Sequence, residues 1–130
     1  MGSKILIVED NAQDRKIITK VLNKAGLRDL VYAQDGYQGT SLAHKEKPDL
    51  IILDINMPAG NGLSILQNLK MAAETENIPV IVHSGSKDEE HKKKVLRYGA
   101  EAFVEKSADP GRLLDAVQKV LNPPAEESAE

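Results

Sequence analysis

The chain has 130 residues, which suits one domain with its own hydrophobic core and is too short for two ordinary ones. Hydrophobic residues make up 41% and charged residues 28%, values that exclude a disordered chain or a membrane protein. Seventeen Lys and Arg against twenty Asp and Glu give a net charge of −3, which offers a phosphate backbone no general attraction and argues against direct nucleic-acid binding.

Five apolar runs alternate with five helical patterns along the chain. The runs predict strands at residues 5–8, 30–33, 50–53, 80–82 and 102–104, and the stretches between and after them predict helices at 12–25, 36–46, 63–72, 88–98 and 109–121. The first helix is expected to bury Ile17, Ile18, Val21, Leu22 and Ala25. Two helices are followed by glycine, and the last begins with Asp-Pro, which is typical of a cap and a first helical residue.

The strict alternation predicts an α/β fold with a five-stranded parallel sheet, doubly wound by helices, because parallel neighbours need crossover connections. The continuously apolar strands indicate a sheet covered on both faces. We expect one domain over residues 1–122 and a disordered acidic tail over 123–130 (PPAEESAE). The start of the chain has neither a signal peptide nor a membrane anchor, and there is no Cys, so a cytoplasmic location is expected.

Chemically active residues follow the predicted strands. Glu9 and Asp10 follow the first strand, Asp54 the third, Ser84 the fourth and Lys106 the fifth, and ligands of open α/β sheets bind outside these carboxyl ends. Three adjacent carboxylates repel by about 1 to 4 kcal/mol per pair, so a cation is required. The sequence therefore predicts Mg²⁺ held by the three acids, with the lysine completing charge balance and Asp54 positioned as a nucleophile toward phosphorus.

The segments "ILIVEDN", "LIILDINMP", "PVIVHSG" and "FVEK" resemble the signatures of the response-regulator receiver domain of two-component signalling, over residues 4 to about 121. The resemblance implies a flavodoxin-like (βα)5 fold with strand order 2-1-3-4-5. It further implies that Asp54 accepts a phosphoryl group from a sensor histidine kinase or a histidine phosphotransfer protein. Such a protein is a signalling switch that assists its own phosphorylation and dephosphorylation, not an enzyme in the ordinary sense.

The resemblance also assigns individual roles. The backbone carbonyl of Asn56 joins the Mg²⁺ ligands, Lys106 pairs with one phosphoryl oxygen, and Ser84 hydrogen-bonds another. Phe103 then turns toward the space that the serine vacates, and the face formed by helix four, strand five and helix five changes for a downstream target protein. One departure is that Ser107 follows the lysine where the family has a proline in a cis peptide, which leaves the approach of the lysine open.

Each residue also has a purely structural reading. Asp54 is the kind of residue that caps a turn, and Glu9 and Asp10 the kind that stabilise a helix start. A lone serine or lysine is usually a loop or surface residue, and the single Phe suits a core. The three histidines, at 44, 83 and 91, lack metal-ligand spacing and are interpreted as structural or surface residues.

Three other functions compete with a phosphorylated receiver. A flavodoxin-like nucleotide binder needs a Ser, Thr and Gly-rich loop after strand one, where this chain has two acids that repel phosphate. A phosphatase with an aspartate nucleophile places D-x-D at that strand, whereas here Glu9 and Asp10 are adjacent. The alternative that ranks second is a degenerate, non-phosphorylated receiver that acts as a protein-docking module.

Overall fold

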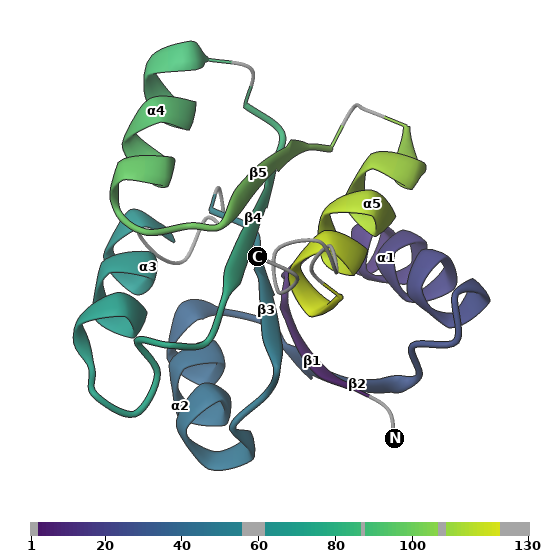
Figure 1. The fold of residues 1–130 in the computed structure, drawn as a ribbon, viewed down its shortest axis with the longest axis horizontal. Coiled ribbons are helices and arrows are strands. Elements are labelled where there is room, and N and C mark those ends of the chain that lie inside the picture. Colours follow the sequence, from purple (N-terminus) through teal and green to yellow (C-terminus); the bar gives the residue numbers. More distant parts are fainter. Residues whose placement is uncertain (1–2, 56–61, 87, 107–108, 123–130) are drawn as a thin grey trace, which may run out of the picture.

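The computed structural model describes residues 3–55, 62–86, 88–106 and 109–122, which alternate between strands and helices (Figure 1). The strands are β1 Lys4–Val8, β2 Asp29–Ala33, β3 Leu50–Leu53, β4 Val80–Ser84 and β5 Ala102–Glu105. The helices are α1 Ala12–Lys24, α2 Gly36–Glu46, α3 Gly62–Met71, α4 Glu89–Arg97 and α5 Pro110–Leu121.

All strand pairs are parallel, and the strand order is β2-β1-β3-β4-β5, as the resemblance implied. Helices α1 and α5 cover one face of the sheet, and α2, α3 and α4 cover the other (Figure 1). The predicted doubly wound, flavodoxin-like fold is therefore confirmed. β1 lies inside the sheet, with β2 on one side of it and β3, β4 and β5 on the other. Ligand sites in such folds lie at the carboxyl ends of the strands, at the point where the strand order reverses.

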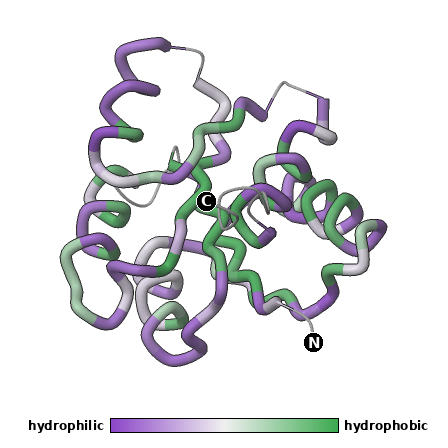
Figure 2. Tube along the Cα trace, viewed as in Figure 1, coloured by the Kyte–Doolittle hydropathy of each residue, from purple (hydrophilic) through white to green (hydrophobic). Residues whose placement is uncertain are grey.

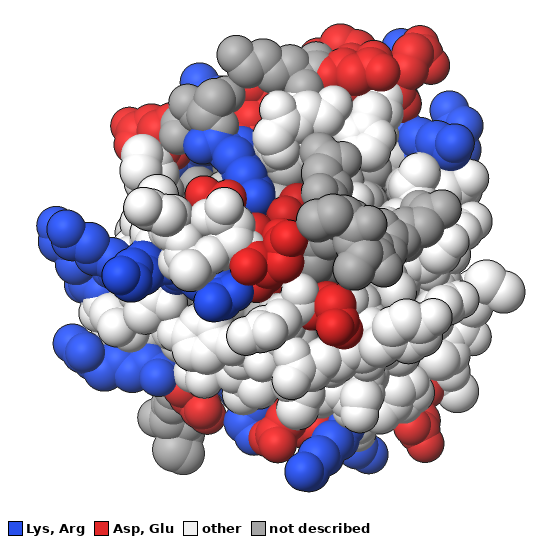
Figure 3. Space-filling model, turned by 180° about the vertical axis from the view of Figure 1, so that it is seen from behind, with Lys and Arg blue, Asp and Glu red and all other residues white. Residues whose placement is uncertain are grey.

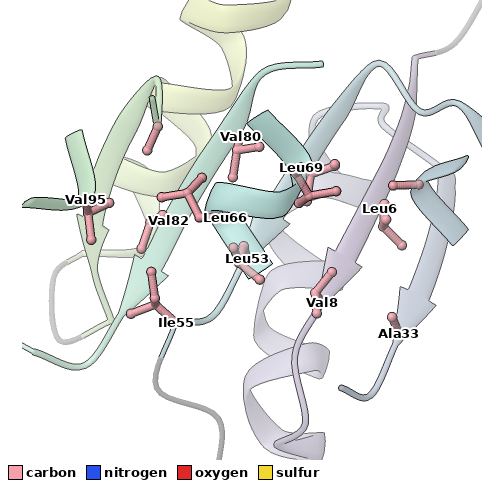
Figure 4. Close-up of a cluster of buried hydrophobic side chains, with 13 residues drawn as sticks. Leu6, Val8, Ala33, Leu53, Ile55, Leu66, Leu69, Val80, Val82 and Val95 are labelled. Carbon is pink, nitrogen blue, oxygen red and sulfur yellow. The ribbon is translucent and has the colours of Figure 1, made fainter. Parts of the chain in front are cut away.

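Two clusters of buried side chains, one on each face, form the core. On the α2, α3 and α4 side, Leu6, Leu53, Leu66, Val82 and Val95 belong to one cluster (Figure 4). Every residue of β3 and β4 is buried, which explains why their sequences are apolar without alternation. The strands accordingly form the hydrophobic interior of the trace (Figure 2). Burial of each large aliphatic side chain contributes about 1.5 to 3 kcal/mol to the stability of the fold. These strands therefore fix the positions of the residues that follow them.

The helix ends match the predicted signals. Gly26 and Gly99 follow α1 and α4 with φ of 88° and 108°, a conformation that glycine adopts without steric cost. Asp109 caps α5 by accepting a hydrogen bond from the Gly111 N–H at 2.9 Å. The cap of α1 is Asn11, whose side chain accepts from a first-turn N–H, so the helix start is capped by neither Glu9 nor Asp10.

Two expectations from the sequence are wrong in detail. Ile17 and Ala25 were expected on the buried face of α1, but Ile17 is 48% exposed and Ala25, the C-cap residue, is exposed as well, because only Ile18 and Leu22 on that helix face the core fully. Strand β4 is two residues longer than predicted, since its pairing with β5 continues to Ser84 opposite Glu105. Ser84 is thus the last strand residue and not the first of a loop.

No helix within the described ranges has the length and apolar character needed to cross a lipid bilayer. The tail expected at 123–130 lies outside the described residues, so the domain boundary at 122 stays a prediction.

Candidate functional site

Backbone pairing aligns the ends of the central strands. Val8 and Leu53 are register partners, and the N–H of Asp54 donates to the carbonyl of Val8 at 3.0 Å. The N–H of Glu9 donates to the carbonyl of Ala33 on the other neighbouring strand, also at 3.0 Å. The two acids therefore leave adjacent strands at the same level and are fixed by main-chain hydrogen bonds.

Three predicted acids come together at this edge. Glu9, Asp10 and Asp54 each offer one carboxylate oxygen, and these oxygens all lie within 4.8 Å of one another. Glu9 is only 1% exposed and Asp54 only 4%, whereas Asp10 is exposed. Acidic side chains gather at the centre of the face in Figure 3, with basic side chains beside them. Buried like charges at this spacing are unfavourable unless a cation lies among them.

Lys106 supplies one positive charge to the cluster. Its Nζ lies 3.1 Å from Asp54 Oδ2, 3.0 Å from Glu9 Oε1 and 2.8 Å from Asp14 Oδ2. Its backbone N–H donates to the carbonyl of Ser84 at 2.7 Å, which anchors the lysine to the end of β4. Burial favours the neutral amine, but hydrogen bonds to the three carboxylates outweigh it and raise the pKa of Lys106. The amine is therefore charged and held between acids.

The carboxylate of Glu9 is buried and only partly hydrogen-bonded. Burial raises its pKa to about 7, the hydrogen bond from Lys106 works against that increase, and the nearby charge of Asp54 adds to it. Its Oε2 accepts hydrogen bonds from Lys106 Nζ at 3.2 Å and from the Asn11 N–H at 3.2 Å. Its Oε1 is buried and, within the part of the chain that is described, makes no hydrogen bond, although Nζ lies 3.0 Å away.

This donor set fits a small, hard divalent cation. Mg²⁺ prefers carboxylate oxygens and water, and it usually binds one or two carboxylates directly. The buried, unsatisfied Glu9 Oε1 and the neighbouring oxygens of Asp10 and Asp54 provide that chemistry. Asn56, whose backbone carbonyl was predicted to join them, lies outside the described residues, as does Ser107.

Ser84 and Phe103 lie on one face of the sheet. Val82 is the register partner of Phe103, and side chains alternate along a strand, so Ser84 points to the same side as both. Ser84 is fully buried, and its Oγ accepts a hydrogen bond from the Ser86 N–H at 3.1 Å. The partly buried ring of Phe103 packs edge-on against His91 of α4, with 5.9 Å between ring centroids.

Two site residues were not predicted. Asp14 and Arg15, both in the first turns of α1, reach back to the strand ends: Asp14 pairs with Lys106, and Arg15 Nη1 donates to the carbonyl of Glu9 at 2.8 Å. The available signal was their position, four and five residues after Asp10, in a helix that starts at the site.

The histidines have the structural roles that the sequence indicated. His44 pairs with Glu74 on the surface at 2.7 Å, and His91 packs against Phe103. His83 is 8% exposed, and burial, reinforced by the charge of Lys106, lowers its pKa to about 4. Within the described residues, the group that could hold a metal contains carboxylates and no histidine.

Comparisons with known proteins identify the class. The family model for the response regulator receiver domain matches residues 5–118. The chain is 36% identical over 119 residues to the protein PilH of Pseudomonas aeruginosa, covering 92% of this chain and 98% of PilH. The phosphate regulon transcriptional regulatory protein PhoB of Escherichia coli is 32% identical over 121 residues, and the match covers 93% of this chain but 52% of PhoB. The chain therefore spans about half the length of that relative.

Solved structures agree with the sequence matches. The chemotaxis protein CheY4 of Vibrio cholerae is similar with a TM-score of 0.83 at 28% identity, over 92% of this chain and 99% of that chain. The Mn(2+)-bound form of the response regulator Rcp1 is similar with a TM-score of 0.74 at 26% identity, over 91% of each chain. The chain belongs to the response regulator receiver domain family of two-component systems.

Proposed function

We propose that Asp54 is the phosphoacceptor of this receiver domain and that the acceptor works with Mg²⁺. The observation that carries the proposal is the position of Lys106 Nζ, 3.1 Å from Asp54 Oδ2, beside the oxygens of Glu9 and Asp10. Such an arrangement compensates the charge of a bound phosphoryl group, which is most of what phosphoryl transfer asks of a protein.

In the proposed reaction, a carboxylate oxygen of Asp54 forms a bond to phosphorus as the P–N bond of a phosphohistidine breaks. The donor imidazole keeps the electron pair of that bond and takes a proton from solvent. Mg²⁺, held by Glu9, Asp10 and Asp54 with the carbonyl of Asn56, would neutralise charge on the phosphoryl oxygens. Lys106 would pair with one of those oxygens, and β3 keeps the attacking carboxylate in place.

The proposed switch links Ser84 to Phe103. Both lie on the same face of the sheet, and the serine hydroxyl would hydrogen-bond a phosphoryl oxygen, so that the aromatic ring moves toward the space beside β4. His91 of α4 touches that ring edge-on, so the movement would repack the face formed by α4, β5 and α5. This face would then bind a downstream target.

The proposed phosphoryl donor is a sensor histidine kinase or a histidine phosphotransfer protein. Membership of the response regulator receiver domain family supports a signalling role. We place that role in the cytoplasm, with the phosphorylated face acting on another protein or on a further part of a longer chain.

Intact-mass spectrometry tests the acceptor. With acetyl phosphate and Mg²⁺, the wild-type chain should gain one phosphoryl mass, and EDTA should prevent the gain. Asp54→Asn should show none, whereas Asp49→Asn, which changes an exposed acid before β3, should match the wild type. Retained labelling in Asp54→Asn would place the acceptor elsewhere. No labelling of the wild type would favour the docking-only receiver.

A further inference from the structure

A basic groove lies beside α1, on the side away from α5. It has a volume of about 690 Å³ and runs between the outer face of α1 and the edge strand β2. Its charged lining residues are Arg15, Lys16, Lys20, Lys24 and Arg28, and no acid lines it. In Figure 3 basic side chains form a band on the left, where α1 lies in that view. The groove is therefore strongly basic, although the whole chain has a net charge of −3.

The cations of the groove are available for a partner. Among the residues that the structure describes, none of Lys16, Lys20, Lys24 and Arg28 has an ion-pair partner. Arg15 differs, because its guanidinium donates to the carbonyl of Glu9. Uncompensated charges of one sign that share a groove raise the local concentration of ligands of the opposite sign.

The groove also has a fixed floor. Tyr32 of β2 and Thr19 of α1 share a hydrogen bond between their hydroxyl groups at 2.7 Å, which joins the strand to the helix. Tyr32 is 39% exposed, so its ring adds apolar surface between the basic side chains. A ligand that fits must combine negative charge with aliphatic or aromatic contact.

The spacing of the lysines favours an extended peptide. Lys16, Lys20 and Lys24 recur every four residues, so they line one side of α1 about 6 Å apart. In an extended chain, alternate side chains point to the same side and are about 6.6 Å apart. β2 is an edge strand of the sheet and, among the described residues, pairs with β1 alone. A peptide strand can use that open edge through its backbone, which a nucleic acid or a lipid surface cannot.

We propose that the groove binds an extended acidic segment of a partner protein, which adds beside β2 and directs alternate Asp or Glu side chains at the lysines of α1. Main-chain hydrogen bonds to β2 provide part of the affinity, and the lysine spacing provides selectivity for acids at every second position. The groove shares only Arg15 with the surroundings of the acidic site and lies apart from the α4, β5 and α5 face, so this proposal does not depend on phosphorylation of Asp54.

A labelled synthetic peptide, acetyl-Thr-Glu-Val-Glu-Val-Glu-Thr-amide, provides the probe, and fluorescence anisotropy at low salt measures its binding. Lys20→Glu combined with Lys24→Glu should weaken binding at least tenfold. Lys93→Glu combined with Lys94→Glu changes the net charge equally on exposed α4 residues and should alter binding less than twofold. Arg15 is left unchanged because it also contacts Glu9. Circular dichroism checks that both variants are folded.

Two further measurements locate the bound segment. Amide NMR shifts should concentrate in β2 and α1. Replacing the central Glu of the peptide by Pro should weaken binding at least fivefold more than replacing it by Gln, because both changes remove the carboxylate and only Pro removes the backbone donor. Equal loss in the two charge variants, no binding of the peptide, or shifts concentrated outside β2 and α1 would overturn the proposal.

The remaining outcomes concern other occupants. Tighter binding of oligo-dT or of phosphatidylglycerol vesicles through the same lysines would replace the peptide as the ligand and refute it. The proposal would also be refuted if the peptide bound only to the variant with Glu126→Gln, Glu127→Gln and Glu130→Gln. The acidic end of the chain itself would then be the segment that occupies the groove.

Discussion

Asp14 connects α1 to the site through its ion pair with Lys106. At 2.8 Å its contact with Lys106 is shorter than the contacts of Glu9 and Asp54, and its side chain is 30% exposed. Ser107 follows the lysine where the family has a proline, and Asp14 provides a side-chain contact from α1 to Lys106. In the proposed reaction, the same carboxylate would compete with a phosphoryl oxygen for the amine.

Asp14→Asn should accelerate phosphorylation of Asp54 by acetyl phosphate about threefold to fivefold. The variant removes one negative charge beside the incoming anion, which at this exposure corresponds to about 1 kcal/mol. Initial rates of mass gain measure the effect, and Asp115→Asn, an exposed acid on α5, removes the same charge at a distance as the control. A slower reaction in Asp14→Asn would show that restraint of Lys106 outweighs repulsion of the donor.

His83 should make the folded state sensitive to acid. Its pKa is lowered to about 4 by burial, and its unfolded value is about 6.5, so the folded state takes up fewer protons in between. This contribution is complete above pH 6.5 and is lost as the pH falls toward 4. The raised pKa of Glu9, about 7, works in the opposite direction as the pH falls from 7, so the wild-type profile is flattened.

Comparison with His83→Met isolates the histidine, because Glu9 is present in both proteins. Between pH 7.5 and pH 5, the unfolding free energy of His83→Met should gain about 2 kcal/mol relative to the wild type. Urea unfolding at each pH measures the difference. A difference that does not change with pH would mean that His83 takes up its proton without leaving the core.

At the scale of elements, the sequence predicted strands and helices to within a few residues. Continuous apolar runs and end signals such as Gly26, Gly99 and Asp109 are local, so they are readable without the fold. The exposure of Ile17 could not be predicted from the sequence. The 3.6-residue rhythm gives the direction of the buried face on the helix but not the width of the face that the sheet covers.

The start of α3 is an element junction that tolerates no side chain. A Cβ at Gly62 would overlap the backbone carbonyl oxygen and Cα of Ile55, just after β3. Gly62→Ala should therefore lower the unfolding free energy by about 1 to 3 kcal/mol in urea unfolding. Gly85→Ala meets nothing within 4 Å and should change it by less than about 0.5 kcal/mol. Equal effects of the two substitutions would exclude close packing at this junction as the cause.

At the scale of the whole molecule, the sequence predicted those site residues whose positions follow from the strand topology. Parallel strands bring their carboxyl ends to one edge of the sheet. The sequence alone therefore predicted that Glu9, Asp10, Asp54 and Lys106 lie there. Asp14 was not predicted, because its contact depends on the rotation of α1 over the sheet, which no local pattern encodes. The open edge of β2 beside basic residues likewise emerges only when strand order and helix placement are combined.

The extent of the folded unit is the remaining whole-molecule prediction. Val120 and Leu121, near the end of α5, pack against the core on the α1 and α5 side, and residues 123–130 lie outside the described residues. A chain that ends at Asn122 should unfold with a free energy within about 0.5 kcal/mol of the full chain. A chain that ends at Gln118 should lose about 2 kcal/mol, because two partly buried aliphatic side chains are removed. Thermal and urea unfolding measure both, and a loss above about 1 kcal/mol on removing 123–130 would extend the domain beyond residue 122.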